Sequence, residues 1–281
     1  MAYWRRRMRF RNLIHGGLLL AAGAAVLALE RRRRARPYVE PRLTHITRNL
    51  AIAGIAAATV QLVEAPLVVP LARLVERRRW GLTHAIGGPP WLRAAVAVLL
   101  LDYTLYLWHV LVHRVPALWR FHLVHHIDRD VDATTGLRFH AGELAASVPW
   151  RAAQLIVIGA SPTALTVWQS LTLVSVLFHH SNTRLGDRME RWLSWIVATP
   201  RMHAMHHAVD PALLQANFSS GLAVWDRLHG TARFDVDAAT VTVGVQGYLD
   251  PGAVSLRRSL ALPFETISAA DAMPAPSVAR S

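Results

Sequence analysis

The chain has 281 residues, of which 53% are hydrophobic and 17% are charged. Because soluble domains carry about 25% charged residues, this composition excludes an ordinary soluble globule, and it is far too apolar for a disordered chain. The absence of cysteine excludes disulfides, thiolate metal sites, iron–sulfur clusters and cysteine nucleophiles. The 31 basic residues are all arginine and exceed the 18 acidic ones, giving a net charge of +13. This charge is interleaved with long apolar runs, so it indicates a membrane protein with no nucleic-acid partner.

Three apolar runs early in the chain predict membrane helices. The first, residues 12–29, follows five arginines and resembles a signal peptide, but Glu30 and four arginines come next without a small-residue cleavage site. We therefore expect a retained helix that is long enough to cross a bilayer. The second run, residues 46–71, contains a glutamate and two prolines, where the helix is expected to end or kink. The third run, residues 91–112, is again long enough to span.

The next apolar block, residues 144–178, is too long for one helix and is interrupted at Ser161-Pro162. Two helices of about 16 residues each, joined at that point, form a hairpin. The polar segments on either side of the hairpin, 113–143 and 179–207, then face the same aqueous side. The predicted fold is all-α: an integral membrane bundle of about four to five membrane helices, with a histidine-rich cap at the membrane face.

We divide the chain into N-terminal membrane helices, a histidine-rich domain and a polar extension, over residues 1–90, 91–233 and 234–281. Within the extension, residues 240–245 favour a short strand and residues 256–262 a basic amphipathic segment. Residues 268–281 are expected to be disordered.

Histidines are concentrated in the central part of the chain. Of the 15 histidines, 11 lie between His109 and His207, where an even distribution would place about five. Their spacing is regular: one H-x-x-x-H pair is followed by two copies of H-x-x-H-H. These motifs comprise His109 and His113, then His122, His125 and His126, then His203, His206 and His207.

This spacing predicts a metal site with two ions. Residues three or four apart share one helix face, and two imidazoles there can bind one ion, as in H-E-x-x-H zinc sites. Adjacent residues point about 100° apart, so the second histidine of each HH pair is placed to reach a neighbouring ion. His140 and His180 are further candidate ligands, and His179 is a possible one. Candidates to orient the imidazoles are Asp102, Asp128, Glu143, Asn182, Asn217 and Asp226.

An all-nitrogen ligand set suits iron, zinc, copper or nickel. The membrane setting and the two ions favour iron and oxygen chemistry, because an inert hydrocarbon needs a stronger oxidant than any side chain. Two alternatives remain open on these residues alone. One is a membrane zinc hydrolase, although such enzymes usually add a carboxylate ligand and a glutamate base, which the motifs lack. The other is a non-enzymatic haem or metal-binding membrane protein.

Residues 95–233 resemble the fatty acid hydroxylase/sterol desaturase superfamily. The resemblance rests on the three histidine motifs in their order and spacing, and on the intervening runs Thr135-Gly-Leu-Arg-Phe-His140, His180-Ser-Asn182, Asn217-Phe and Trp225-Asp226-Arg-Leu. It implies that residues 91–233 form the catalytic domain of a membrane-bound, non-haem di-iron enzyme. Such enzymes use O₂ and two electrons to hydroxylate or desaturate a lipid C–H bond.

Carried over by resemblance, the metal-binding residues are the eight histidines of the three motifs, and His140 and His180 match further family histidines. Two residues depart from the family pattern: Ala141 stands where proline is common, and His229 stands where phenylalanine is usual. Neither departure removes a histidine of the motifs. The resemblance also implies a fatty acyl, sterol or related lipid substrate and a metal site at the cytoplasmic face. Because no haem-binding or flavin motif is visible, the electrons are expected from a separate reductase, ferredoxin or cytochrome b5-like donor.

Overall fold

The computed structural model describes residues 2–265, with side chains from residue 14 onward, and this part of the chain is all-helical. The long helices are α1 (Ala2–Arg32), α2 (Arg42–Thr59), α3 (Ala65–Arg78), α5 (Pro90–Val112), α7 (Ala141–Ile158) and α8 (Pro162–His180). The short helices are α4 (Leu82–Ile86), α6 (Pro116–His126), α9 (Asp187–Leu193), α10 (Pro200–His206), α11 (Pro211–Leu214), α12 (Val224–Leu228) and α13 (Leu256–Ala261).

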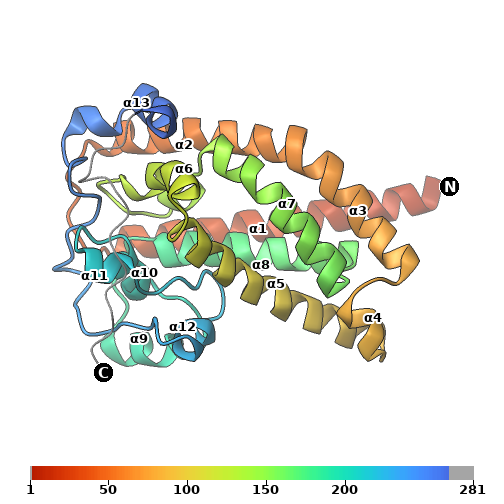
Figure 1. Ribbon diagram of the computed structural model, residues 1–281. Coiled ribbons are helices and arrows are strands. Elements are labelled where there is room, and N and C mark those ends of the chain that lie inside the picture. Colours follow the sequence, from red (N-terminus) through yellow and green to blue (C-terminus); the bar gives the residue numbers. More distant parts are fainter. Residues whose placement is uncertain (1, 266–281) are drawn as a thin grey trace.

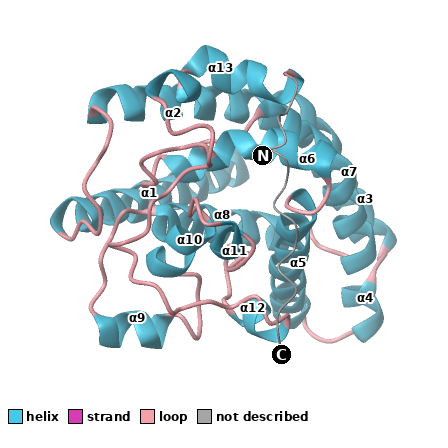
Figure 2. Cartoon of the chain, turned by 60° about the vertical axis from the view of Figure 1, so that its left-hand side comes forward, coloured by secondary structure: helices cyan, strands magenta, loops and turns pink. Residues whose placement is uncertain are grey.

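The long helices lie side by side as a bundle, and most of the short helices cover one end of it as a cap (Figure 1). The core of the bundle is formed by apolar side chains of α3, α5, α7 and α8, including Leu101, Leu155 and Trp168. Viewed toward the cap, α10 and α11 lie together near α8, and α6 lies next to α7 (Figure 2). The all-α prediction is confirmed.

The predicted hairpin is confirmed in α7 and α8. Gly159 ends α7 with a φ of 81°, a left-handed conformation that favours glycine. The Ser161 hydroxyl then caps α8 by accepting from the Ala164 amide, and Pro162 occupies the first helical turn. A side chain at Gly159 would also collide with the carbonyl of Trp80. Because the turn lies at the far end, the start of α7 and the end of α8 both reach the cap (Figure 1).

The expected kink in the second apolar run is also present. Between α2 and α3 the chain forms one π-helical turn, η1 (Val60–Glu64), and α3 contains Pro70 in its interior. Pro66, in the first turn of α3, has no N–H to bond to the carbonyl of Leu62 in η1, which explains the irregular geometry of that turn.

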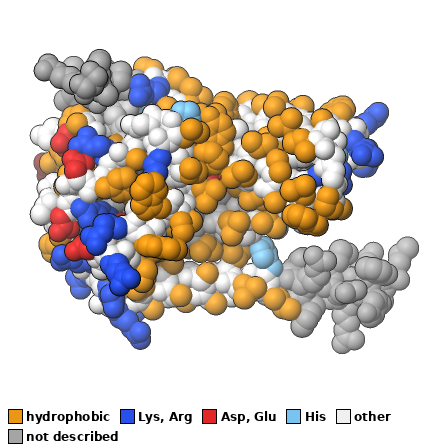
Figure 3. Space-filling model, turned by 90° about the horizontal axis from the view of Figure 1, so that it is seen from below, with side chains coloured by type: hydrophobic (Ala, Val, Ile, Leu, Met, Phe, Trp, Pro, Cys, Tyr) orange, Lys and Arg blue, Asp and Glu red, His pale blue; other side chains and the backbone are white. Residues whose placement is uncertain are grey.

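Three helical stretches are long and apolar enough to cross a membrane: Ile14–Arg32, Arg42–Ile86 and Pro90–Val112. Membrane crossing by α7 and α8, which the count of four to five requires, stays a prediction. The outer faces of the helices carry exposed leucines such as Leu20 and Leu62. One side of the molecule accordingly shows a broad apolar surface over the bundle, with charged side chains at the cap and arginines at the opposite end (Figure 3).

The prediction of a strand at residues 240–245 is wrong. This segment forms turns, and its only ladder contact within the described residues is one bridge between Val243 and Ala208. The amides of Val209 and Gly244 add hydrogen bonds to Thr242 and His207. Residues 207–209 pair with this segment only through these contacts, and its apolar side chains pack on Met205 and Ala208, so it is a loop packed against α10 and the turn after it. The amphipathic segment 256–262 forms α13, whereas the expected disordered tail, 268–281, lies outside the described residues.

Candidate metal centre

Four helices bring histidines together where the bundle meets the cap. His109 lies in the last turn of α5 and His113 directly follows that helix. The first H-x-x-H-H motif ends α6, and the second ends the short helix α10, which begins at Pro200 after a capping Thr199. His180 is the last residue of α8. The hairpin and the two short helices thus place segments that are distant in sequence at one level of the bundle.

The structure gathers nine of the ten predicted ligand histidines into two buried groups, and within each group the nitrogens lie within 4.8 Å of one another. The first group, here called site A, consists of His109, His113, His122, His126 and His206. The second group, site B, consists of His125, His180, His203 and His207. Each HH pair is divided between the two sites, as the helical angle between adjacent residues predicted.

Hydrogen bonds on the outer side of the rings fix which nitrogen faces the centre of each site. In site A, Nδ1–H of His109 donates to the carbonyl of Phe218 at 2.6 Å, and Nδ1–H of His206 donates to the carbonyl of Ala216 at 2.8 Å. In site B, Nδ1–H of His180 donates to the Val176 carbonyl at 2.8 Å. Since a carbonyl only accepts, the proton of each ring lies on Nδ1 and leaves Nε2 as a lone pair.

These lone pairs face each other at short range. The Nε2 atoms of His109 and His206 are 3.0 Å apart, as are those of His125 and His180. Nδ1–H of His125 likewise donates a hydrogen bond, to the carbonyl of Arg138 at 3.3 Å. Two nitrogens without protons cannot form a hydrogen bond and would repel each other. Ligands of one ion at 2.0–2.1 Å are separated by about 2.9–3.4 Å, so the spacing in each group matches that of nitrogens that share one metal ion.

The electrostatics of the groups also suit metal binding. Burial, reinforced by the neighbouring imidazoles, lowers the pKa of His126, His203, His206 and His207 well below the usual value. The rings are therefore neutral at physiological pH, which is the form that ligates metals. Both groups offer nitrogen alone, with no carboxylate among the described ligand atoms.

His140 does not join either group. It caps α7, where its Nδ1 accepts from the Gly142 amide at 2.9 Å and its Nε2 donates to the Leu260 carbonyl at 3.3 Å. Both ring nitrogens are therefore engaged, and the structure places His140 outside both histidine groups. His179 is buried with its ring 4.1 Å from that of His203, but its nitrogens lie outside both groups.

Of the six residues expected to orient the imidazoles, Glu143 alone contacts a histidine of the two sites. Its carboxylate accepts from Nδ1–H of His122 at 3.1 Å. Three others hold the segment that supplies the Phe218 and Ala216 carbonyls. Asp226 accepts from the Phe218 amide, and Asn217 donates to the Met202 carbonyl. Asp102 accepts from the Leu222 amide and from the indole N–H of Trp225. Asn182 bonds to the backbone of Arg36.

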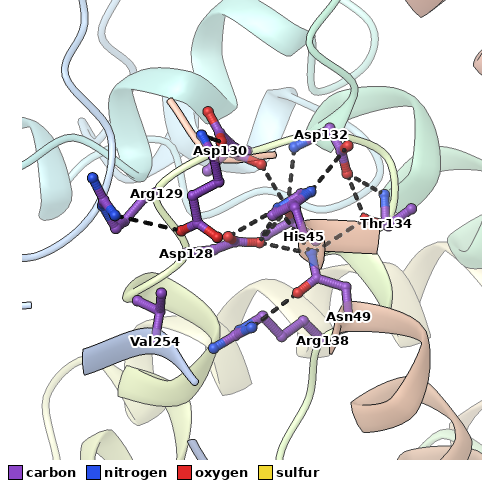
Figure 4. A network of polar contacts seen from close by, with 12 residues as sticks. His45, Asn49, Asp128, Arg129, Asp130, Asp132, Thr134, Arg138 and Val254 are labelled. Atoms are coloured by element: carbon purple, nitrogen blue, oxygen red, sulfur yellow. Dashed lines mark hydrogen bonds and ion pairs between the residues drawn. The ribbon is translucent and has the colours of Figure 1, made fainter. Parts of the chain in front are cut away.

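Asp128, the sixth, organises a buried network beside site B (Figure 4). Its carboxylate accepts from His45 at 3.0 Å, Asn49 at 2.8 Å and Thr135 at 2.7 Å. Burial alone would raise the pKa of Asp128, but the charges of His45 and Arg138 hold it well below its usual value. The role of His45 could not be predicted from the sequence, because a single histidine in an apolar helix has no partner that spacing can identify.

Arg138 connects this network to site B. It is completely buried, and burial lowers its pKa to about 10, which still leaves it charged. Its guanidinium donates to the Val124 carbonyl, to the Asn49 side chain and to the Ser259 hydroxyl at 2.7–2.9 Å. Its own carbonyl accepts from His125. Helix α2 and helix α13 therefore both contact the residue that orients one histidine of site B.

An apolar cavity of about 220 Å³ adjoins both sites between α5, α7 and α8. Its wall at the cap includes His109, His122 and His125, and the rest is mainly apolar. Arg151 also lines it, with its guanidinium 4.4 Å from the Trp168 ring and 3.7 Å from the Glu64 carboxylate. A hydrocarbon segment in this cavity would lie against the histidines of both sites.

Residues 94–231 match the family model for fatty acid hydroxylases. The chain is 29% identical over 174 residues to the ornithine lipid hydroxylase OlsE of Rhizobium tropici. This aligned region covers 61% of this chain and 50% of that protein. It is 28% identical to the alkylglycerol monooxygenase of Xenopus tropicalis, over 46% of this chain and 28% of that protein.

A third relative is the cholesterol 25-hydroxylase-like protein of Danio rerio, which is 30% identical over 50% of this chain and 55% of that protein. The match therefore spans about half of two of these relatives and a smaller part of the other. No solved structure matches the chain significantly.

Proposed function

The chain belongs to the fatty acid hydroxylase family through residues 94–231, and on this premise we propose that it is a membrane-bound oxygenase that hydroxylates a lipid C–H bond. The observation that carries the proposal is the pair of buried, all-nitrogen histidine groups beside an apolar cavity. The relatives named above are hydroxylases and a monooxygenase, which favours hydroxylation over desaturation.

We propose that sites A and B each hold one iron ion, with the nine histidines of the two groups as ligands. When bound, the iron ions supply the activation of O₂ that C–H oxidation requires. The overall reaction converts R–H, O₂, two electrons and two protons into R–OH and water. The protein contributes the orientation of the imidazoles through Glu143 and the carbonyls of Phe218, Ala216 and Val176.

The cavity determines which part of the substrate meets the metals. Its mainly apolar wall between α5, α7 and α8 favours an alkyl chain or ring system and excludes water from the reacting carbon. A fatty acyl, sterol or related lipid fits this description. We also propose that a separate donor supplies the electrons and that the cap lies on the cytoplasmic side of the membrane.

Lipid analysis of cells that express the protein tests this function. Cells with the wild-type chain, grown under ¹⁶O₂ or ¹⁸O₂, are compared with cells that express His206→Ala. We expect a lipid whose mass rises by 16 units under ¹⁶O₂ and by 18 units under ¹⁸O₂ in the wild type alone. A loss of 2 mass units would indicate desaturation instead. An oxygen that does not come from O₂, or an equally active His206→Ala variant, would contradict the proposal.

A further inference from the structure

An exposed surface on α9 and the turn that follows combines aromatic and arginine side chains. Arg188, Arg191, Trp192, Trp195 and Ile196 line one shallow hollow of about 510 Å³ at the cap. The two tryptophans are 69% and 68% exposed, whereas tryptophan is usually well buried in a folded protein. An exposed apolar patch of this kind indicates an interaction surface.

The arginines of this hollow are available to a ligand. Arg188 and Arg191 are three residues apart in α9 and therefore share one helix face. Both are exposed, and neither forms an ion pair with any residue from 14 to 265. Helix α9 has two acidic residues, Asp187 and Glu190. Asp187 is exposed, whereas Glu190 is buried and accepts from the Thr199 hydroxyl. The hollow consequently presents two unpaired positive charges next to two indole rings.

An apolar groove of about 500 Å³ lies along the bundle between α5 and α8, and Val197, which follows Ile196 of the hollow in the chain, lines its end at the cap. Residues 196–198 run beside residues 221–223, joined by a bridge between Val197 and Leu222, and this pair lines the groove. Farther along, Leu99 and Leu171 line it, and both are exposed on the helices. The face seen in Figure 3 has arginines and apolar side chains together at the cap, next to the apolar surface of the bundle.

The inner wall of the groove is shared with the cavity beside the metal sites. Trp168 and Thr172 of α8 line both spaces. A chain that lies in the groove is therefore separated from the cavity by these two side chains.

We propose that the hollow and the groove form a binding site for one anionic membrane phospholipid. Arg188 and Arg191 bind its phosphate, since the guanidinium group matches the geometry of phosphate oxygens. Trp192 and Trp195 lie at the level of the lipid headgroup and glycerol, where indole rings are enriched in membrane proteins. One acyl chain lies in the groove between α5 and α8. This proposal concerns binding and does not depend on the oxidation proposed above.

Native mass spectrometry of the purified full chain in detergent tests the headgroup contacts. The protein is titrated with dioleoyl phosphatidylglycerol or dioleoyl phosphatidylcholine. The fraction of protein that carries one bound lipid is measured at each lipid concentration and gives the affinity. We expect a preference for phosphatidylglycerol that the double variant Arg188→Gln/Arg191→Gln loses, with an affinity roughly 30-fold lower, because each arginine near an anionic lipid contributes about fivefold. The matched control, Arg77→Gln/Arg78→Gln, removes two exposed arginines at the opposite end of the bundle and is expected to keep the preference.

A second variant tests the groove. Leu171→Trp fills it from an exposed position and is expected to weaken binding of the same phosphatidylglycerol several-fold. The control is Leu20→Trp, which changes an exposed leucine of α1 and is expected to leave the affinity unchanged. Unchanged lipid preference in the arginine double variant would overturn the proposal. It would also be overturned if light scattering showed a dimer that Trp192→Ala/Trp195→Ala dissociates, because a second copy of the chain would then cover this surface.

Discussion

The imidazole rings of His126 and His207 lie nearly parallel, with 4.3 Å between their centres, although His126 belongs to site A at the end of α6 and His207 to site B directly after α10. Each is the last histidine of an H-x-x-H-H motif. Sites A and B are thus direct neighbours, and the adjacent histidines of each motif divide between them. This arrangement favours a dinuclear centre over two independent metal sites.

Replacing Glu143 is expected to weaken site A selectively. Its carboxylate holds the Nδ1 proton of His122, and the loss of such a partner typically lowers metal affinity about 10- to 100-fold. Glu143→Ala should show the full effect and Glu143→Gln a smaller one, because the amide oxygen still accepts. A competition titration with a metal chelator measures the affinity, and Glu76→Gln, which changes an exposed residue of α3, serves as the control. Equal affinities in Glu143→Ala and wild type would contradict this role.

Gly136→Ala is expected to weaken site B instead. A methyl group at this position would lie 3.0 Å from the carbonyl of Val176 and 3.1 Å from Nδ1 of His180, the two atoms whose hydrogen bond orients His180. We expect about a 10- to 100-fold loss of affinity for one metal ion, with the other unaffected. The same titration measures it. Gly252→Ala meets no atom within 4 Å and should bind both ions as the wild type does.

The Asp128 network should contribute strongly to stability. Asp128→Ala leaves His45 and Asn49 buried without their carboxylate partner, which typically costs about 3–5 kcal/mol. We expect a marked drop in the thermal unfolding temperature in detergent. The control is Asp235→Asn, which removes an exposed ion pair with Arg233 that is worth at most about 1 kcal/mol. Similar unfolding temperatures for the two variants would show that the network is not a stabilising unit.

The pH dependence of the metal-free protein follows from its neutral histidines. In the folded state the pKa of His126, His203 and His206 lies well below the ordinary value near 6.5, so the unfolded chain binds more protons as the pH falls below about 6.5. Stability is therefore retained above this pH and lost progressively below it. Unfolding temperatures measured from pH 8 to pH 5 after chelation check the sign. His203→Gln should flatten the curve, and a wild-type curve independent of pH would contradict the pKa shifts.

Regular spacing made much of the architecture predictable. The apolar runs gave the long helices, Ser161-Pro162 gave the hairpin, and the helical angle predicted that His125 and His126 face different sites. These features depend on local geometry, which the sequence encodes directly.

The features that prediction missed depend on tertiary contacts. The carbonyls of Phe218 and Ala216 orient two histidines, but every residue has a carbonyl, so no residue type marks them. His140 carries a family motif yet caps a helix, because the start of α7 needs an acceptor at that position. The role of His45 became visible only when α2 was placed beside Asp128.

Metal analysis of the purified chain and of two single variants tests the central proposal most directly. By inductively coupled plasma mass spectrometry we expect about two iron ions per wild-type chain, and about one each in His206→Ala, which disrupts site A, and His203→Ala, which disrupts site B. His229→Ala, which changes a histidine outside both sites, should keep two. A wild-type chain that hydroxylates lipid without bound metal, or variants with unchanged metal content, would contradict the proposed centre.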